Sequence, residues 1–275
     1  MPPPDIDVDA YFARIGYGGP RTPTLETLAG IHFRHPQAIP FENLDPLLKR
    51  PIGLTGPALE SKLVRAGRGG WCFEQNLLLC DVLRSIGFQV TGLAARVMWN
   101  VAAGVVRARS HMLLKIDGLE GGPHIADVGF GGLTLTGPVR LVPDVEQLTP
   151  HETFRLTRSA DDFVLQASVR GEWKPLYTFD LQPQLLVDYE VSNWHLATHP
   201  ESPFVNNLMA ARVTPERRYG LFNNKLSTHP LHGDSEQTTL ATPAALREVL
   251  ETLLAIKLPD DPGMGALLER LSTRT

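Results

Sequence analysis

The stretch Arg68-Gly69-Gly70-Trp71-Cys72-Phe73-Glu74-Gln75-Asn76 places two glycines directly before a cysteine. An apolar run follows at once. Its members fall on one side of a helix with about 3.6 residues per turn, until Gly87 ends the pattern. We therefore predict that Cys72 lies in the first turn of a helix. The unpaired N–H groups and the helix dipole there favour an anion, and so the thiolate. Cys72 is a candidate nucleophile, although a free cysteine is more often a small residue of the core.

Composition limits the classes of function. The hydrophobic fraction of 43% in 275 residues is enough for packed cores. A formal net charge of −4 gives no basic surface for nucleic acid. No apolar run approaches the roughly 18 residues of a membrane span, and residues 1–5 show no basic or apolar signal segment. We expect a cytoplasmic protein with no nucleic-acid or membrane partner.

The two cysteines, Cys72 and Cys80, lie on the same predicted helix. Their separation of 80 − 72 = 8 residues corresponds to about 12 Å along a helix axis, which is too far for a disulfide. This pattern is typical of a reducing compartment. Apolar neighbours surround Cys80, so we expect it to be structural.

The order of the periodicities predicts an α+β fold in three parts. Residues 1–87 carry helix-like runs and predict a helical bundle that bears Cys72. Residues 88–182 predict a central antiparallel β-barrel, and residues 183–275 predict an α/β lid. The strand-like runs are 90–99, 110–116, 124–130, 153–157, 163–169 and 173–179, with shorter ones at 209–213, 219–222 and 238–240.

Local signals predict the ends of several helices. Asp7 and Thr24 are expected N-caps of the first two helices, and the second is expected to end before Pro36. In the last part, a helix is expected to open at Pro183. A final long helix is expected from Pro243.

A cysteine nucleophile needs a histidine base, and that base needs an orienting group. His111 lies inside a strand-like run, where its ordinary role would be that of a half-buried residue. Asp127 has apolar neighbours, and a buried carboxylate is costly without a partner. An Asp127–His111 pair facing Cys72 would form a Cys-His-Asp triad. The histidines in predicted loops or beside prolines are expected to be solvated: His35, His151, His199, His229 and His232.

Asp127 has two alternative roles. One is that of a turn residue before Gly129. The other is that of a salt-bridge partner of an arginine such as Arg96 or Arg109.

A metal site is a further alternative. Cys72, His111, His124 and Asp127 are ligand types that zinc accepts. These residues lack the paired spacing of a Cys-x-x-Cys or His-x-x-x-His site, so we expect no metal.

Three motifs, in this order, resemble those of arylamine N-acetyltransferases. They are Arg-Gly-Gly-x-Cys-x-Glu-x-Asn at 68–76, His111 with Met-Leu-Leu after it, and Asp-Val-Gly-Phe-Gly at 127–131. Segments 14–16, 40–43 and 202–204 also resemble that family, so the match spans nearly the whole chain. The first motif is highly specific. The long insertion of vertebrate members between barrel and lid is absent, which favours the bacterial type.

The resemblance implies a helical bundle, a β-barrel and an α/β lid around a core like that of cysteine proteases. It implies ping-pong transfer of an acetyl group from acetyl-CoA to an arylamine or arylhydrazine, through an acetyl-cysteine, with a role in xenobiotic metabolism. It assigns Cys72 as nucleophile, His111 as base and Asp127 as the residue that orients the base.

The resemblance also implies contacts with substrate. Phe41, Phe130 and Phe204 would line the acceptor and acetyl pocket. The segment Gly129–Gly132 would lie against coenzyme A. The full set of expected substrate or coenzyme A contacts is Phe41, Ser110, Gly129, Phe130, Gly131 and Phe204.

Arg68 and Glu42 are expected to pair. A guanidinium in an apolar neighbourhood needs a planar acceptor, and Glu42 is the one acid in the apolar Ile39–Leu44 segment. The pair would hold the turn before Cys72. Glu74 is the rival partner.

Other functions share this chemistry. An amide synthase that closes a macrolactam and a transglutaminase-like thiol hydrolase would both use a Cys-His-Asp group. A binding module that keeps the fold without catalysis is a further alternative. The sequence leaves open the acceptor, the acyl chain, the binding of the coenzyme A nucleotide end and the oligomeric state, with a homodimer as one alternative.

Overall fold

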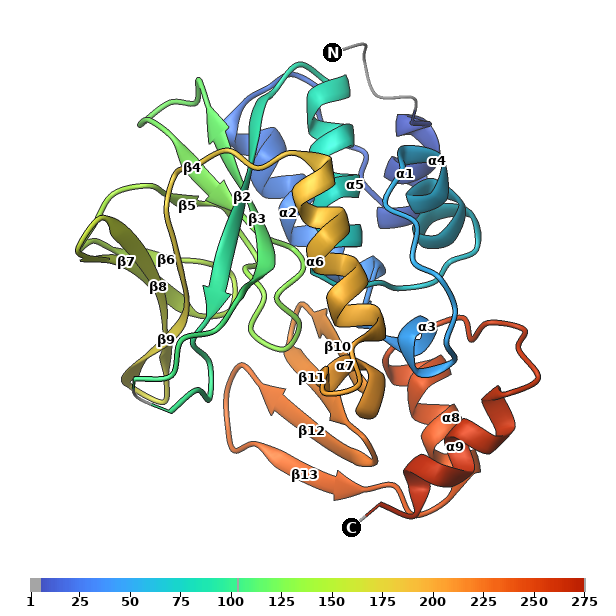
Figure 1. Cartoon of the computed structure of the whole chain (residues 1–275). Coiled ribbons are helices and arrows are strands. Elements are labelled where there is room, and N and C mark those ends of the chain that lie inside the picture. Colours follow the sequence, from blue (N-terminus) through green and yellow to red (C-terminus); the bar gives the residue numbers. More distant parts are fainter. Residues whose placement is uncertain (1–5, 103, 275) are drawn as a thin grey trace.

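The computed structural model describes residues 6–102 and 104–274 and has the expected α+β fold (Figure 1). Residues 1–5, which carry no signal-like pattern in the sequence, lie outside the described part. Helices dominate the first part of the chain. A nearly closed eight-stranded antiparallel sheet follows, and then a five-stranded sheet with further helices.

The helices of the first part include the one that begins at the candidate nucleophile. They are α1 (Val8–Ile15), α2 (Leu25–Ala38), α3 (Leu44–Leu47), α4 (Gly56–Leu59) with its π-helical continuation η1 (Glu60–Arg65), and α5 (Cys72–Ser85). Both predicted N-caps are confirmed. Asp7 Oδ1 accepts the N–H of Ala10 at 2.9 Å, and Thr24 Oγ1 accepts that of Thr27 at 3.2 Å. α5 begins at Cys72, which confirms the prediction that Cys72 lies in the first turn of a helix.

The predicted end of the second helix is wrong. α2 continues through Pro36 to Ala38. A proline removes one hydrogen bond to the preceding turn but leaves the next residues free to stay helical. The N–H of Ile39 closes the last turn on His35 O at 2.8 Å. The side chain of His35 is therefore held inside the protein.

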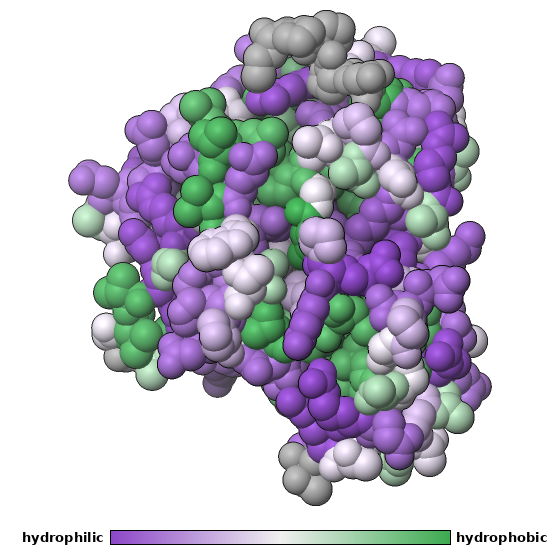
Figure 2. All heavy atoms as spheres, turned by 45° about the vertical axis from the view of Figure 1, so that its right-hand side comes forward, coloured by the Kyte–Doolittle hydropathy of each residue, from purple (hydrophilic) through white to green (hydrophobic). Residues whose placement is uncertain are grey.

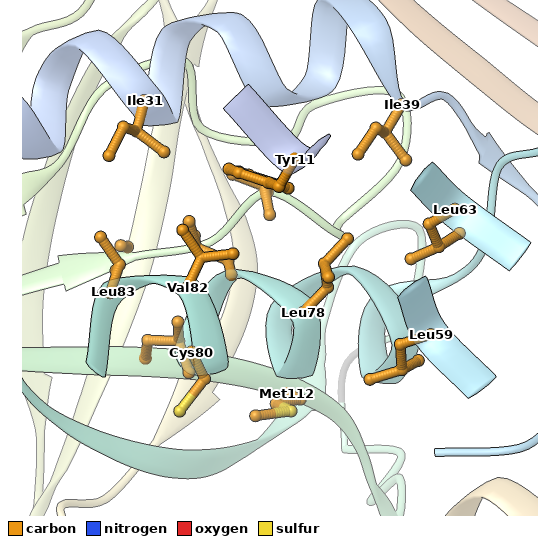
Figure 3. Packing of buried hydrophobic residues seen from close by; sticks show 14 of the residues in the cluster. Tyr11, Ile31, Ile39, Leu59, Leu63, Leu78, Cys80, Val82, Leu83 and Met112 are labelled. Atoms are coloured by element: carbon orange, nitrogen blue, oxygen red, sulfur yellow. The ribbon is translucent and has the colours of Figure 1, made fainter. Parts of the chain in front are cut away.

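Helix α5 is the centre of the first core (Figure 3). Leu78 and Val82 lie between α5 and Tyr11 of α1. Cys80 and Met112 lie on the other side of the helix, against the barrel. This packing places one face of α5 on the helices and the other on strand β3.

The eight-stranded sheet is the predicted barrel, in the order β5-β4-β3-β2-β9-β8-β7-β6. Its strands are β2 (Gln89–Val97), β3 (Arg109–Asp117), β4 (His124–Ala126), β5 (Val139–Arg140), β6 (Glu146–Leu148), β7 (Thr153–Ser159), β8 (Asp162–Val169) and β9 (Glu172–Phe179). The side chain of Gln147 joins the two edge strands. Its Oε1 accepts the N–H of Arg140 at 2.8 Å, and its Nε2 donates to Arg140 O at 2.9 Å. A second apolar core fills the sheet's interior.

The five-stranded sheet has the order β1-β10-β11-β12-β13. Its strands are β1 (Phe41–Glu42), β10 (Met209–Thr214), β11 (Arg217–Phe222), β12 (Lys225–Pro230) and β13 (Glu236–Thr239). The later helices are α6 (Leu186–Thr198), α7 (Pro203–Asn206), α8 (Pro243–Glu248) with π-helical η2 (Val249–Leu253), and α9 (Met264–Ser272). β1 belongs to the first part of the chain but pairs with β10 of the last part, where Phe41 lies opposite Ala211. The five-stranded sheet therefore joins the two parts.

Several predicted elements of the second half are corrected. The helix expected from Pro183 begins at Leu186, and the helix from Pro243 is followed by α9 rather than being final. Strand β12 was not predicted because its one buried apolar residue, Leu226, gives no alternation. The strand at His124 ends at Ala126, where a turn begins.

Hydrophilic residues dominate the face in Figure 2, and apolar residues form separate groups there. Helix α6 buries Tyr189 and Leu196 and exposes Val187, Val191 and Trp194. Within the described residues, no helix is long and apolar enough to cross a membrane.

Candidate active site

The turn before Cys72 requires glycine at position 69 and leaves little room for a side chain at position 70. A Cβ at Gly69 would lie 2.3 Å from Pro40 O, and a Cβ at Gly70 would lie 2.7 Å from Glu74 Oε2. The N–H of Gly70 donates to Pro40 O at 3.2 Å, so the turn lies flat against the segment that enters β1. Cys72 follows as the first residue of α5, with 7% of its surface exposed.

Arg68 pairs with Glu42, as predicted. Its Nε and Nη2 both donate to Glu42 Oε1, at 3.0 and 2.7 Å. Its Nη1 donates to Asp45 Oδ1 at 3.0 Å, a partner that we did not predict. Burial alone would lower the pKa of Arg68, but the charges of Glu42 and Asp45 raise it. These bonds therefore hold Arg68, the residue at which the turn before Cys72 begins, in one position.

Glu74, the rival partner, bonds elsewhere. Its Oε1 accepts from Lys62 Nζ at 2.7 Å, and its Oε2 accepts the N–H of Trp71 at 3.1 Å. Lys62 also reaches Asp45 Oδ2 at 2.6 Å. Burial raises the pKa of Glu74, and Lys62 offsets that rise only in part. We call these five residues the charge cluster: Glu42, Asp45, Lys62, Arg68 and Glu74.

His111 and Asp127 come from neighbouring strands of the barrel. His111 lies in β3, and Asp127 follows β4, which pairs with β3. His111 Nε2 lies 2.7 Å from Asp127 Oδ2, and both side chains are buried. Asp127 Oδ1 accepts from Asn76 Nδ2 at 3.0 Å and from the N–H of Gly129 at 2.9 Å. Burial alone would raise the pKa of Asp127, but His111 and these donors lower it.

Cys72 lies next to this pair. Its Sγ is 3.8 Å from Ser110 O, in the residue before His111. Since Nε2 of His111 faces Asp127, Nδ1 is the ring nitrogen left for Cys72. Burial alone would lower the pKa of His111, but Asp127 and then Cys72 raise it to about 10. The ring is thus held as an imidazolium at neutral pH, the form that stabilises an adjacent thiolate.

The arginine alternatives for Asp127 are wrong, and the turn alternative holds beside the histidine pair. Arg109 pairs with Asp180, and Arg96 donates to a backbone oxygen at 2.6 Å. The bond from the N–H of Gly129 to Asp127 Oδ1 forms the turn that ends the strand.

The zinc candidates do not form one site. His124 Nδ1 lies 2.9 Å from Gly122 O. In the part of the chain that the structure describes, no three His, Cys, Asp or Glu side chains are grouped to hold a metal ion.

A cleft of about 2090 Å³ opens over Cys72 and His111. Phe204 meets Trp71 edge-on at 5.2 Å and lies 6.5 Å from Phe41 between ring centroids. The lining includes every residue expected to contact substrate or coenzyme A: Phe41, Ser110, Gly129, Phe130, Gly131 and Phe204. The cysteine therefore faces a space with aromatic walls that suits a flat apolar ligand.

Two side chains that contact the His111–Asp127 pair were not predicted from the sequence. Asn76 donates to Asp127 and to Met112 O and accepts the N–H of Val128. Its position four residues after Cys72, on the same helix face, was the available signal. Tyr177 places its ring 4.9 Å from that of His111. Burial, and after it Asp127, raises the pKa of Tyr177.

An arginine of the lid holds the loop that follows Asp127. Arg218 of β11 is buried and donates to Glu152 Oε1 at 2.7 Å, Thr134 O at 3.0 Å and Gly132 O at 3.3 Å. This contact was also not predicted, because nothing in the local sequence links β11 to that loop.

The expectation that His35 is solvated is wrong. His35 is fully buried, with Nδ1 2.8 Å from Tyr11 Oη and Nε2 3.2 Å from Gln75 Oε1. The unbroken helix through Pro36 turns this ring into the core. The exposed histidines include two of those expected, His229 and His232.

The fold and this site define a protein of the class built on a cysteine-protease-like Cys-His-Asp core. A family profile described as N-acetyltransferase matches residues 24–262. The arylamine N-acetyltransferase of Mycolicibacterium smegmatis is 43% identical over 262 residues, which are 94% of each chain. That of Escherichia coli is 41% identical over 95% of this chain and 92% of its own. The chain belongs to the arylamine N-acetyltransferase family of acyltransferases.

Solved structures agree. The arylamine N-acetyltransferase of M. tuberculosis superposes with a TM-score of 0.92 at 41% identity, over 96% of this chain and 100% of its own. The Mycobacterium marinum enzyme in complex with CoA has a TM-score of 0.92 at 38% identity, over 96% and 99%. The predicted fold class is thereby confirmed.

Proposed function

We propose that this chain transfers an acetyl group from acetyl-CoA to the nitrogen of an arylamine or arylhydrazine, through an acetylated Cys72. One observation carries the proposal. Cys72 begins α5 at the cleft, beside a buried His111 whose Nε2 lies 2.7 Å from Asp127. Family membership supports the donor and the acceptor class, as does the CoA complex of the M. marinum relative.

In the first half-reaction, the Cys72 thiolate attacks the thioester carbonyl. The first turn of α5 has N–H groups without partners one turn earlier, and these would stabilise the oxyanion. The C–S bond to coenzyme A breaks, and the His111 imidazolium gives its proton to the departing thiolate. The products are acetyl-Cys72, coenzyme A and a neutral imidazole.

In the second half-reaction, the amine attacks the acetyl-cysteine. His111 leaves the first half-reaction as a neutral imidazole, which is the form that accepts a proton, and it no longer faces a thiolate. It takes the amine proton as the Cys72 thiolate leaves, which restores the starting ion pair. Asp127 holds the ring orientation and stabilises the imidazolium in both steps.

Phe41, Phe130 and Phe204 are proposed to hold the aromatic acceptor. Gly129 and Gly131 are proposed to lie against coenzyme A, because a residue without a side chain lets a ligand approach the backbone. Ser110 is proposed to contact coenzyme A as well. All these residues come from one chain, so the proposal needs no second subunit. The homodimer remains a prediction.

Mass spectrometry of the protein after incubation with acetyl-CoA tests the proposal. We expect one added acetyl group, on the peptide that contains Cys72, and its transfer to an added aromatic amine. Cys80→Ala is the matched control and should be acetylated normally. Asp127→Asn should keep the thiol but lose most of the rate, because an amide cannot stabilise the imidazolium.

The outcomes separate the alternatives. Loss of the acetyl group to water at the same rate with and without amine would favour a thiol hydrolase. Transfer only from a carrier-bound acyl chain would favour an amide synthase. No acetylation of the folded wild-type protein would refute the proposal.

A further inference from the structure

A second histidine contacts Asp127 from behind. His32 lies in α2, and its side chain has no exposed surface. Its Nε2 accepts the backbone N–H of Asp127 at 3.1 Å. β4 ends at Ala126, so the ladder with β3 stops one residue before Asp127. His32 thus supplies the acceptor that the sheet does not.

This contact determines which nitrogen of the His32 ring carries the proton. Because the Asp127 N–H is a donor, Nε2 of His32 must be unprotonated, and the proton of the neutral ring lies on Nδ1. Burial lowers the pKa of His32 to about 4, against the opposing charge of Asp127. The neutral form is therefore the stable one at neutral pH.

The second nitrogen of His32 is unusual. Among the described residues, two buried side-chain polar atoms have no hydrogen-bond partner, His32 Nδ1 and Tyr177 Oη. Both belong to residues that adjoin Asp127. An unpaired buried polar group destabilises a fold, so stability does not account for a histidine at this position.

We propose that His32 is a positioning residue, which fixes the main chain of Asp127 so that its carboxylate meets His111. The other contacts to this segment come from Asn76 on α5, from Gly129 within the turn itself, and from Thr134, whose hydroxyl donates to Asp127 O at 3.0 Å. His32 is the contact from α2, and it acts on the backbone rather than on the carboxylate. Without it, the main-chain N–H of Asp127 loses its acceptor, and the carboxylate is positioned less precisely against His111.

Four variants separate positioning from core packing. His32→Gln keeps an acceptor near the place of Nε2, whereas the amide of His32→Asn is too short to reach the N–H of Asp127. His32→Leu removes the acceptor and keeps an apolar volume. His35→Leu is the matched control, because His35 is one turn away, equally buried, and contacts Tyr11 and Gln75 instead.

Three measurements are made on each variant: titration of His111 by NMR, the rate of Cys72 alkylation by iodoacetamide at neutral pH, and kcat/KM with acetyl-CoA and an arylamine. We expect His32→Leu to lower the pKa of His111, slow alkylation and reduce kcat/KM on the order of 10²-fold, as a small misplacement can. His32→Gln should restore all three toward wild type, and His32→Asn should not. His35→Leu should lower the midpoint of urea unfolding and leave the His111 titration unchanged.

Two results would overturn the proposal. One is a folded His32→Leu protein with the wild-type His111 titration. The other is equal behaviour of the Gln and Asn variants, a comparison that still decides if the Leu variant fails to fold. Only the kinetic readout rests on the proposed function. If wild-type Cys72 is not acetylated, that function fails, and the His111 titration still tests the role of His32.

Discussion

Replacing Arg68 by glutamine removes one of the two cations of the charge cluster. The cluster has two cations, Lys62 and Arg68, and three anions, so the variant leaves 2 − 1 = 1 cation within it. Arg50, outside the cluster, still reaches Asp45 Oδ1 at 3.3 Å, so Glu42 is the carboxylate that loses its bonded cation. Arg68 and Glu42 are 5% and 1% exposed, so water cannot replace the lost charge.

The expected loss follows from the contacts. Arg68 makes two hydrogen bonds to Glu42, at 3.0 and 2.7 Å, and one to Asp45 at 3.0 Å. Each bond to a charged group contributes about 1.5–3 kcal/mol. Arg68 regains hydration on unfolding, so the sum overstates the loss. Removing one member of a buried pair typically costs ~3–5 kcal/mol. Since a domain has only about 5–15 kcal/mol of stability, Arg68→Gln should be marginally folded.

A double-mutant cycle with Glu42→Gln measures the interaction. Urea unfolding is followed by tryptophan fluorescence and far-UV circular dichroism, and coincident transitions are required before a free energy is assigned. We expect a coupling of about 1–3 kcal/mol between Arg68 and Glu42. The control cycle of Arg68 with Glu74 should show a smaller coupling, because Glu74 bonds Lys62 directly and is linked to Arg68 only through Lys62 and Asp45.

Turnover per folded molecule should change less than stability, since Arg68 acts on the turn before Cys72 rather than on substrate. Additive losses for Arg68 and Glu42 would refute the reasoning. A larger coupling of Arg68 to Glu74 would do so as well, because it would mean that the hydrogen bonds do not set the energetics of the cluster.

Three further predictions concern the triad geometry. The pKa of His111 is raised from 6.5 to about 10, so its stabilisation should be complete below pH 6.5 and disappear as the pH rises through about 10; a flat urea midpoint across this window would contradict it. Cys80→Ala should lower the free energy of unfolding by about 1 kcal/mol and keep acetyl transfer, whereas Cys72→Ala should keep the fold and abolish transfer; equal loss of transfer would reverse the assignment. A Cβ at Gly129 would lie 2.6 Å from Cys72 Cα, so Gly129→Ala should slow acetylation of Cys72 on the order of 10²-fold in a folded protein. Gly265→Ala in α9, which meets no atom within 4 Å and does not line the cleft, is its control and should acetylate normally.

Local features of the fold could be predicted because local interactions decide them. The caps at Asp7 and Thr24 and the start of α5 at Cys72 depend on groups within one helical turn. The continuation of α2 through Pro36 goes against the helix-ending preference of proline. β12 pairs with β11 in a hairpin, with Phe222 opposite Lys225, although its residues do not alternate between apolar and polar. Propensity alone therefore misjudged both.

For the site, the sequence by itself determined the chemistry that was needed. A cysteine at a helix start favours its anion, and a carboxylate among apolar residues requires a partner, wherever the chain folds. Only the tertiary structure decided that Asp127 meets His111 rather than Arg109, and that His32 holds it from behind. The physical reason is that a buried charge requires a partner but does not specify one. The packing of α2, α5 and the barrel determines which side chain lies within hydrogen-bond distance.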